Sequence, residues 1–384
     1  MRVLSVGGGS GGHVTPVLAV INELAKLDSH LDVLFVTDKA FLEQSTGLMQ
    51  HAVVPVAVRT IVAGKLRRYK DVPLHKQLLH WPTVSKNVVD SGKVFVGILQ
   101  SLWLLIRYRP DVVFAKGGYV SLPVGLAARF LRVPLVVHDS DARPGLTNRI
   151  LARYATQIAT GAPVEYYPAY KGVPITYVGV PIDSNYHPFT AQEQRQAKAA
   201  IGIVDCDKPL VVVTGGGLGS RDINRAILSV ADQLLDDNLA VYHIAGKKHA
   251  AEVEAAAPAH PDYHVIPFVY KDMMTVLGAA DVVVSRASAT FLQEIAALHK
   301  PAVIVPSSSL GDQLKNAEAI RQDAAAIVMS DEELADDPQS LLDIIVKITT
   351  DSQLNSLLSE AIGRRAMPAA AADTAKIILK AKKG

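Results

Sequence analysis

The chain has 384 residues, of which 49% are hydrophobic and 20% are charged. At roughly 150 residues per domain this length indicates two or three domains, and the composition is that of a globular protein. The 39 basic and 37 acidic residues give a net charge of +2, which does not favour a general nucleic-acid-binding protein. The single cysteine, Cys206, excludes an intrachain disulfide and a cysteine-built metal cluster.

No stretch has the pattern of a signal peptide or of a membrane-spanning helix. The apolar run Val3–Val6 is short and leads into glycines, which predicts a buried first strand. The most apolar later stretch, Val94–Ile106, has 13 residues, whereas a spanning helix needs roughly 20. We therefore expect a protein that is soluble or lies on a membrane surface.

Short β-branched apolar runs alternate with longer helical patterns along the chain. Continuous apolar runs are expected of strands covered on both faces, and the alternation of strands with helices predicts parallel sheets. The expected strands are Val3–Val6, Asp32–Val36, Val112–Ala115, Leu135–His138, Leu210–Thr214, Val241–Ala245, Val282–Ser285 and Ala302–Val305. The expected helices include Pro16–Lys26, Asp222–Asp236 and Ala289–Leu298.

The order of strand, glycine turn and helix occurs twice. The first glycine-rich loop begins at Gly7 and the second at Gly215, 208 residues later. This repeat predicts an α/β protein of two Rossmann-like domains. The proline-containing stretch Val180–Pro188 is the expected joint, which gives domains 1–182 and 183–365. Residues from about 366 to 384 are expected to form a final helix with a basic end that packs back on the first domain.

The segment from Gly64 to Pro110 carries cations on both sides of an apolar, tryptophan-bearing stretch. It opens with the basic run Lys65–Lys70, contains Trp81 and Trp103, and closes with Arg107–Arg109. This pattern suits a helix at a membrane–water interface. An ordinary amphipathic helix that covers a sheet explains the same pattern, so both interpretations remain open at this point.

The first glycine loop satisfies the spacing G-x-G-x-x-G at Gly7, Gly9 and Gly12. Such glycines let backbone amides approach a ligand at the positive end of the next helix. The spacing fits a dinucleotide site with Asp38 on the ribose, a site for another phosphate-bearing ligand, or a purely structural turn. His13 follows the last glycine and favours proton transfer or phosphate contact over a nicotinamide site. A capping or packing histidine is the alternative.

A second glycine turn, Gly117–Gly118, follows the expected strand Val112–Ala115. The carboxyl ends of parallel strands meet at one edge of a sheet, so this turn and the Gly7 loop are expected to share that edge. Two such turns side by side can hold a diphosphate through their amides. A glycine pair alone is more often only a turn.

Three stretches of the second half end expected strands with small or polar residues. In the Gly215–Gly219 loop the amides repeat the phosphate-binding pattern, and Arg221 either adds charge or pairs with Asp222. After the strand Val282–Ser285, Ser288 opens a helix. Glu294, on the second turn of that helix, either accepts both hydroxyls of a ribose or lies on the helix surface. Asp312 and Gln313 either contact sugar hydroxyls or cap a helix.

Taken together, these motifs resemble the MurG family of bacterial glycosyltransferases, which move N-acetylglucosamine (GlcNAc) from UDP-GlcNAc to undecaprenyl-pyrophosphoryl-MurNAc-pentapeptide. Each motif alone is weak evidence, whereas their order and spacing over most of the chain are specific. The resemblance is carried by residues 7–16, 64–69, 116–123, 145–149, 215–219, 286–294 and 312–317.

The resemblance implies a GT-B fold, with two Rossmann-like domains facing a central cleft, and an inverting transferase of peptidoglycan synthesis that uses no cofactor. No acidic pair is clearly placed to hold a divalent metal, so we expect metal-independent catalysis. The implied partners are UDP-GlcNAc, the lipid-linked acceptor and the cytoplasmic face of the bacterial plasma membrane, with other cell-wall synthesis proteins as candidates and no nucleic acid.

His13 is the residue we expect to act as catalytic base or to position the acceptor. Glu294 is implied to contact the ribose, and Gln313 the GlcNAc hydroxyls. The expected acceptor-binding residues are Gly9, Gly12, Gly117, Gly118 and Tyr119. The expected donor-binding residues are Ser10, Gly11, Asp141, Gly217, Ser288, Glu294 and Gln313.

Three stretches depart from the family pattern. The family stretch His-Glu-Gln-Asn is His138-Asp139-Ser140-Asp141 here, Gly217 and Leu218 replace a serine and a glutamine, and Asp183 follows Val180-Pro181-Ile182 where an arginine is usual. These departures leave open a related lipid glycosyltransferase with another donor or acceptor. A sugar-nucleotide-binding protein without catalysis and an NAD(P)-dependent oxidoreductase are the more distant alternatives.

Overall fold

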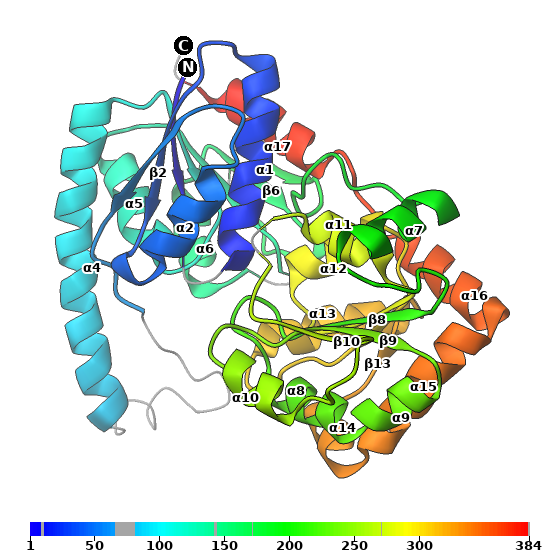
Figure 1. Cartoon of the computed structure of the whole chain (residues 1–384). Coiled ribbons are helices and arrows are strands. Elements are labelled where there is room, and N and C mark those ends of the chain that lie inside the picture. The colour runs from blue at the N-terminus through cyan, green and yellow to red at the C-terminus, as the bar shows by residue number, and fades with distance from the viewer. Residues whose placement is uncertain (9–10, 66–80, 142–143, 171, 270, 383–384) are drawn as a thin grey trace. The chain divides into compact units, whose positions relative to one another are not determined.

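The computed structural model describes residues 1–8, 11–65, 81–141, 144–170, 172–269 and 271–382 (Figure 1). The chain divides into two compact units. The first consists of Met1–Asp183 together with Ala369–Gly384, and the second of Ser184–Pro368. The limits expected from the sequence, after residue 182 and near residue 366, lie close to these.

The first unit contains a parallel sheet whose described strands follow the order β3-β2-β1-β4-β5-β6-β7. Strand β1 lies between β2 and β4, so the order of the sheet reverses beside β1, and ligands of such sheets bind at the carboxyl ends of the strands there. The strands are β1 Arg2–Val6, β2 Asp32–Thr37, β3 Val56–Thr60, β4 Val112–Ala115, β5 Leu135–Asp139, β6 Gln157–Thr160 and β7 Ile175–Tyr177.

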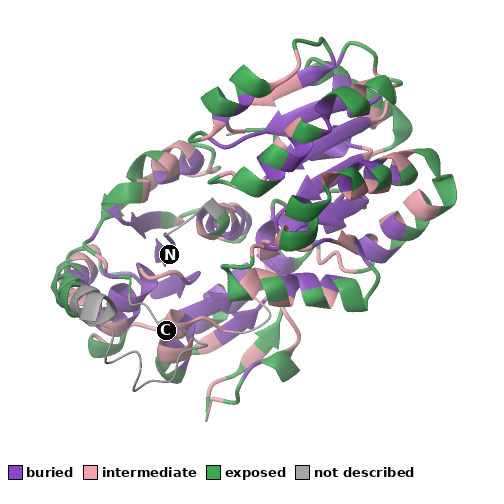
Figure 2. Cartoon of the chain, turned by 90° about the horizontal axis from the view of Figure 1, so that it is seen from below, coloured by how far each residue is buried: buried purple, intermediate pink, exposed green. Residues whose placement is uncertain are grey.

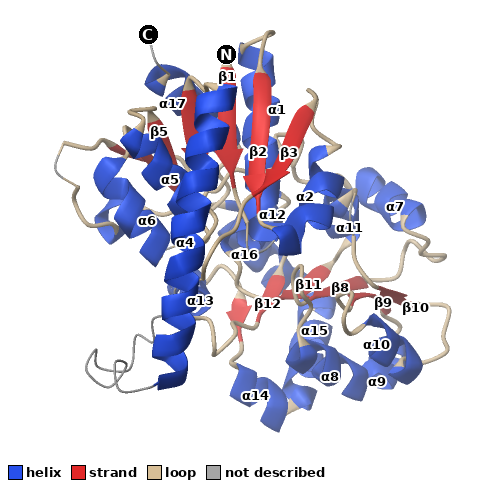
Figure 3. Cartoon of the chain, turned by 90° about the vertical axis from the view of Figure 1, so that its left-hand side faces the viewer, coloured by secondary structure: helices blue, strands red, loops and turns tan. Residues whose placement is uncertain are grey.

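Helices cover both faces of this sheet, which explains its continuous apolar strands (Figures 2 and 3). Val3 belongs to an apolar cluster with residues of α1 and α17, whereas the next residue, Leu4, belongs to a cluster with residues of α4 and α5. The helices are α1 Gly11–Leu27, α2 Leu42–Met49, α4 Trp81–Tyr108, α5 Ser121–Phe130, α6 Leu146–Leu151 and α17 Ala370–Ala381, with short 3₁₀ turns at Lys39–Phe41, Ala152–Tyr154 and Val164–Tyr166.

The C-terminal helix α17 contacts α1, although the two are far apart in the sequence. Its buried residues Ala375, Ile378 and Ala381 lie in the same apolar cluster as Val3. The C-terminus of the chain therefore completes the core of the first unit.

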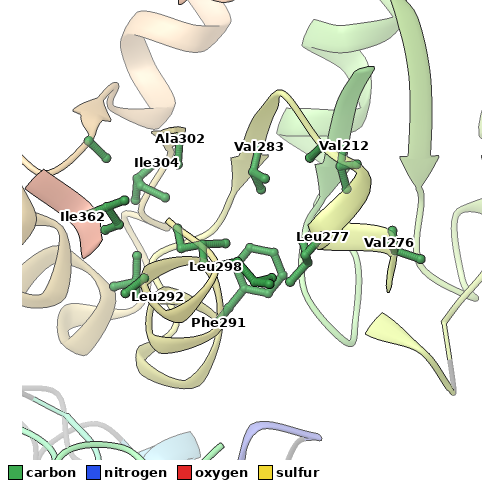
Figure 4. Close-up of a cluster of buried hydrophobic side chains, with 14 of the residues drawn as sticks. Val212, Val276, Leu277, Val283, Phe291, Leu292, Leu298, Ala302, Ile304 and Ile362 are labelled. Atoms are coloured by element: carbon green, nitrogen blue, oxygen red, sulfur yellow. The ribbon is translucent and has the colours of Figure 1, made fainter. Parts of the chain in front are cut away.

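The second unit repeats the design with the described strand order β10-β9-β8-β11-β12-β13. Val211 and Val212 of β8 face two different apolar clusters, one on each side of the sheet. In Figure 4, Phe291 and Leu292 lie close to Leu277 and Ile304 in one of these clusters. The strands are β8 Leu210–Thr214, β9 Ala240–Ile244, β10 Tyr263–Ile266, β11 Val282–Ser285, β12 Ala302–Ile304 and β13 Ile327–Val328.

The helices of the second unit cover both faces of its sheet. They are α7 Ala191–Ala200, α8 Arg221–Ser229, α9 Ala231–Asp236, α10 Ala250–Ala256, α11 Met273–Ala279, α12 Ala289–Ala297, α13 Gly311–Gln322, α14 Asp331–Asp336, α15 Pro338–Thr350 and α16 Ser352–Gly363.

Two expected helices differ from the structure. Helix α1 begins at Gly11, five residues before the expected start at Pro16, so His13 lies in its first turn. The expected helix Asp222–Asp236 is two helices, because the ψ angle of 10° at Val230 leaves the helical region between α8 and α9.

Helix α4 is 28 residues long and contacts α5. Its residues Asn87–Tyr108, with a mean hydropathy of 1.4, are long and apolar enough to cross a membrane by length and composition. The apolar run Val94–Ile106 lies within this longer segment, which also contains Asp90 and Lys93. An exposed row, here called the α4 apolar stripe, consists of Val88, Val89, Phe95, Val96, Leu99, Trp103 and Ile106. The cations at positions 66–70 and the side chain of Trp81 lie outside the described residues.

Candidate active site

The two glycine turns of the first unit lie in contact at the carboxyl edge of its sheet. Gly118 has a φ of +77°, and a Cβ atom there would lie 2.3 Å from the carbonyl oxygen of Gly8 and 3.5 Å from Cδ2 of His13. No side chain fits between the turns, so glycine is required at this position. The expected adjacency of the turns is confirmed. Of the expected ligand-binding residues, Gly9 and Ser10 lie outside the described part of the chain, and Gly11 and Gly12 belong to α1.

His13 sits where these turns meet the start of α1. Its Nδ1 atom is buried and has no hydrogen-bond partner within the described residues. Burial lowers the pKa of His13 to about 3, with a smaller contribution from the positive charge of Lys116. The imidazole is therefore neutral near pH 7 and can accept a proton.

An ionic cluster of the first unit contains Asp141, which was expected to bind the donor, together with Lys116 and Asp139, for which no role was expected. The side chain of Lys116, directly after β4, donates a hydrogen bond to Oγ of Ser140 at 2.5 Å. Lys116 is 1% exposed and Asp139, at the end of β5, is 3% exposed. Burial lowers the pKa of Lys116, and burial together with the charge of Asp141 raises the pKa of Asp139. A charged residue directly after an apolar strand was the available signal.

The Tyr119 side chain, expected to face the acceptor, donates its hydroxyl hydrogen bond to Asp38. The other carboxylate oxygen of Asp38 accepts the amide hydrogen of Phe41 at 3.1 Å. Both oxygens of Asp38 are thus engaged within the protein. This arrangement does not favour the dinucleotide interpretation, in which Asp38 holds a ribose.

Three adjacent strands, β8, β11 and β12, bring the expected donor-binding residues of the second unit to one sheet edge. Gly217 lies in the loop after β8, which ends at Ser220, the N-cap of α8. Ser288 is the N-cap of α12 and accepts the amide hydrogen of Phe291 at 3.4 Å. The first turns of both helices therefore present backbone N–H groups at this edge.

Glu294 and Gln313 follow on α12 and α13. Burial raises the pKa of Glu294 to about 8, so its carboxyl group is largely protonated near pH 7. The side-chain oxygen of Gln313 accepts the amide hydrogen of Ser307 at 2.9 Å, which orients its amide beside the loop after β12. A protonated carboxyl group can donate one hydrogen bond and accept others.

Arg286, at the end of β11, is a second buried cation that the sequence analysis did not place in the site. It donates to Asp222 at 3.0 Å and to the carboxylate of Asp331. Asp331 in turn accepts the amide hydrogen of Ser308 at 2.8 Å. Asp222 therefore forms an ion pair with Arg286, which does not support the alternative in which Asp222 pairs with its sequence neighbour Arg221. Arg286 ties α8 to the loop after β12.

A buried hydrogen-bonded triad supports the Gly215–Gly219 loop. Asn224 donates to the carbonyl oxygen of Ala245 at 3.0 Å, so its side-chain oxygen accepts from Nε2 of His243 at 3.0 Å. The hydroxyl of Tyr263 then donates to Nδ1 of His243 at 2.9 Å. Burial lowers the pKa of His243 to about 4, which fits this neutral tautomer. A Cβ on Gly219 would lie 2.4 Å from the Ala245 oxygen, so the loop rests directly on this triad.

No group of three or more metal-ligating side chains was found in a search of the described residues. The absence of cofactor and metal from the reaction therefore stays a prediction.

The two parallel sheets, each with glycine turns at the carboxyl ends of its central strands, have the architecture of the GT-B fold. Two family models match the chain: the glycosyltransferase family 28 N-terminal domain at residues 3–160 and the family 28 C-terminal domain at residues 210–373.

Curated relatives match nearly the whole chain. A protein of Clostridium kluyveri, named UDP-N-acetylglucosamine–N-acetylmuramyl-(pentapeptide) pyrophosphoryl-undecaprenol N-acetylglucosamine transferase, is 32% identical over 372 residues, which cover 94% of this chain and 95% of the relative. A protein of the same name from Lachnospira eligens is 32% identical over 359 residues, 91% of each chain. The chain belongs to glycosyltransferase family 28 and, within it, to the family of these N-acetylglucosamine transferases, the MurG family.

Solved structures share the fold. The crystal structure of MurG from Acinetobacter baumannii matches with a TM-score of 0.69 at 23% identity, covering 99% of both chains. The calicheamicin glycosyltransferase CalG4 matches with a TM-score of 0.65 at 16% identity, covering 99% of this chain and 98% of its own. At these identities the likeness concerns the fold alone.

Proposed function

We propose that this chain transfers GlcNAc from UDP-GlcNAc to the N-acetylmuramyl sugar of a pyrophosphoryl-undecaprenol-linked pentapeptide, the reaction for which its relatives are named. The observation that carries the proposal is the position of His13. Its neutral imidazole lies where two glycine turns meet, and its buried Nδ1 has no partner among the residues that the structure describes. That arrangement suits a base beside a bound diphosphate.

His13 is the proposed base. A sugar hydroxyl is a poor nucleophile until a base removes its proton. In the proposed step the acceptor oxygen forms a bond to the anomeric carbon of GlcNAc, the bond from that carbon to UDP breaks, and His13 takes the hydroxyl proton. The negative charge of a bound diphosphate would raise the pKa of His13 from about 3 towards the working pH. Direct displacement inverts the anomeric carbon.

Backbone amides are the proposed ligands of both diphosphates. In the first unit the turns at Gly8 and Gly118 would face the acceptor diphosphate, with Gly117 and Tyr119 beside them. In the second unit the Gly215–Gly219 loop and the first turn of α12 would face the donor diphosphate. Preorganised N–H groups stabilise the charge that develops on a leaving phosphate. This proposal requires neither a metal ion nor a cofactor.

The second unit supplies the proposed recognition of the nucleotide and the sugar. Glu294 would hold the ribose hydroxyls, and its raised pKa favours a neutral carboxyl group that does not repel a neighbouring diphosphate. Gln313, oriented by Ser307, would contact the GlcNAc hydroxyls. Ser288 and Gly217 lie at the same sheet edge.

The α4 apolar stripe is the proposed contact with the cytoplasmic surface of the plasma membrane. The lipid-linked acceptor is embedded in that membrane, and the stripe exposes Phe95, Leu99 and Trp103. Arg107 follows the stripe near the end of α4, where a cation can meet anionic headgroups. Other cell-wall synthesis proteins remain candidate partners at this surface.

A donor panel tests the proposed function. The protein in detergent is given the lipid-linked acceptor with UDP-GlcNAc, UDP-glucose or UDP-GalNAc. We expect transfer from UDP-GlcNAc with inversion at the anomeric carbon. Preferred transfer of another sugar, or transfer only to a diacylglycerol-type lipid, would contradict the proposal and indicate a related lipid glycosyltransferase. Thermal stabilisation by NAD(P)H and not by UDP-GlcNAc would reject the class of reaction.

A further inference from the structure

Lys116 is a buried cation that the proposed reaction does not yet use. It directly follows β4, and its side chain is 1% exposed. Burying an ammonium group is costly unless other charges and hydrogen bonds compensate it. Such groups occur most often where a site needs their charge.

The loop after β5 surrounds the Lys116 ammonium with compensating groups. The ammonium donates to Oγ of Ser140 at 2.5 Å. Ser140 lies between Asp139 and Asp141 in the sequence. The charges of Asp141 and Asp139 both favour the protonated ammonium. The backbone of Asp141 is held on both sides: its amide donates to Asp139 at 3.2 Å, and its carbonyl accepts from the Tyr167 hydroxyl at 2.5 Å.

The same lysine is connected to the glycine turns. Its amide donates to the carbonyl oxygen of Val6 at the end of β1, at 3.1 Å. The next two residues form the turn that ends at Gly118, which lies against Gly8 and His13. The backbone of Lys116 is therefore joined to the turn, and the positive charge of its side chain acts on His13 beside that turn, because after burial that charge lowers the pKa of His13 further.

We propose that Lys116 is a positioning residue of the transfer reaction: its ammonium, with Asp141 as counter-ion, fixes the Gly117–Gly118 turn against His13 and supplies positive charge behind the acceptor diphosphate. Because the lysine is buried, it acts through the turn and through its electric field, not by contact. The inference rests on the proposed function. The proposal also accounts for the aspartate at position 141, where the family pattern has asparagine. A neutral asparagine would not supply a negative charge to the buried Lys116 ammonium.

A double-mutant cycle of Lys116→Met and Asp141→Asn tests the pair without any substrate. Each single variant removes one partner of the Lys116–Asp141 interaction and leaves the other charge less compensated, whereas the double variant removes both. We expect the double variant to lose less thermal stability than the two single losses added together. Strict additivity would overturn the pairing, even if the wild-type protein transferred no sugar.

Kinetics separate a positioning role from a merely structural one. We expect Lys116→Met to raise the KM for the lipid-linked acceptor roughly tenfold and to leave the KM for UDP-GlcNAc within about twofold. The double variant should keep this acceptor defect although it loses less stability than the two single losses added together, because the positive charge is still missing. Restoration of the acceptor KM in the double variant, or an unchanged acceptor KM in Lys116→Met, would overturn the role. If Lys116→Met does not fold, the double variant alone decides the kinetic test.

Lys198 offers a matched control in the second unit. It is also buried, at 4% exposed, and pairs with Asp281 at 2.7 Å. Lys198→Met removes a buried cation far from the glycine turns in the sequence and in a different unit. It should lower thermal stability without a selective rise in the acceptor KM. If Lys198→Met raised the acceptor KM as much as Lys116→Met does, the loss of any buried lysine would produce the kinetic defect, and the specific role of Lys116 would be overturned.

Discussion

Replacing three side chains of the α4 apolar stripe should abolish most of the membrane binding of this protein. Phe95, Leu99 and Trp103 are 63%, 53% and 64% exposed, and they recur at the four-residue spacing of one helix face. Full burial of such a side chain is worth roughly 1.5–3 kcal/mol, so transferring the exposed part of each into lipid contributes about 1 kcal/mol. Changing all three to serine should therefore weaken vesicle binding by about 3 kcal/mol, or roughly 10²-fold.

The assay is co-sedimentation with vesicles that contain phosphatidylglycerol. The thermal unfolding midpoint should change little, because exposed positions contribute little to the core. Leu357 of α16 is the control, since it is 59% exposed in the second unit. Leu357→Ser should bind vesicles as the wild type does. Wild-type-like binding by the triple variant would refute the assignment of the stripe.

Three further predictions concern the two sheet edges. His13→Ala should lower kcat roughly 10²-fold or more with an unchanged KM for UDP-GlcNAc in steady-state kinetics; retained turnover would reject His13 as the base. Burial raises the pKa of Glu294 from 4.5 to about 8, so its contribution to stability falls as the pH rises through that window. Unfolding midpoints of Glu294→Gln should therefore depend less on pH between 4.5 and 8 than those of the wild type, and equal slopes would contradict the burial argument. Asn224→Asp sets a carboxylate oxygen against the Ala245 carbonyl and should raise the KM for UDP-GlcNAc roughly tenfold; a similar rise in the acceptor KM would show a general defect instead.

The sequence was sufficient to predict the central strands because both of their faces are buried. Leu210–Val213 is apolar throughout, since alternate residues enter different cores. Strands β3, β7, β10 and β13 lie at sheet edges, and β6 lies next to one. These strands were not expected, because polar residues interrupt the apolar pattern in β3, β7 and β10, and the apolar runs in β6 and β13 are short.

Part of the candidate site also follows from the sequence. Glycine turns after two neighbouring parallel strands must lie at one edge, and the contact between Gly8 and Gly118 confirms it. The ion pairs of the candidate site could not be predicted in this way. Asp222 pairs with Arg286, which is 64 residues away, and not with the adjacent Arg221. Lys116 directly follows an apolar strand, which was the one available signal, but its partner Ser140 comes from the loop after a different strand and cannot be predicted from spacing along the chain.

The most direct test of the account is transfer of radiolabelled GlcNAc by the wild-type protein from UDP-GlcNAc to lipid-linked N-acetylmuramyl-pentapeptide. We expect label in the lipid product, one UDP released for each sugar transferred, and an inverted anomeric configuration. Release of UDP without labelled lipid, or no reaction with both substrates present, would contradict the central claim that this chain is the N-acetylglucosamine transferase.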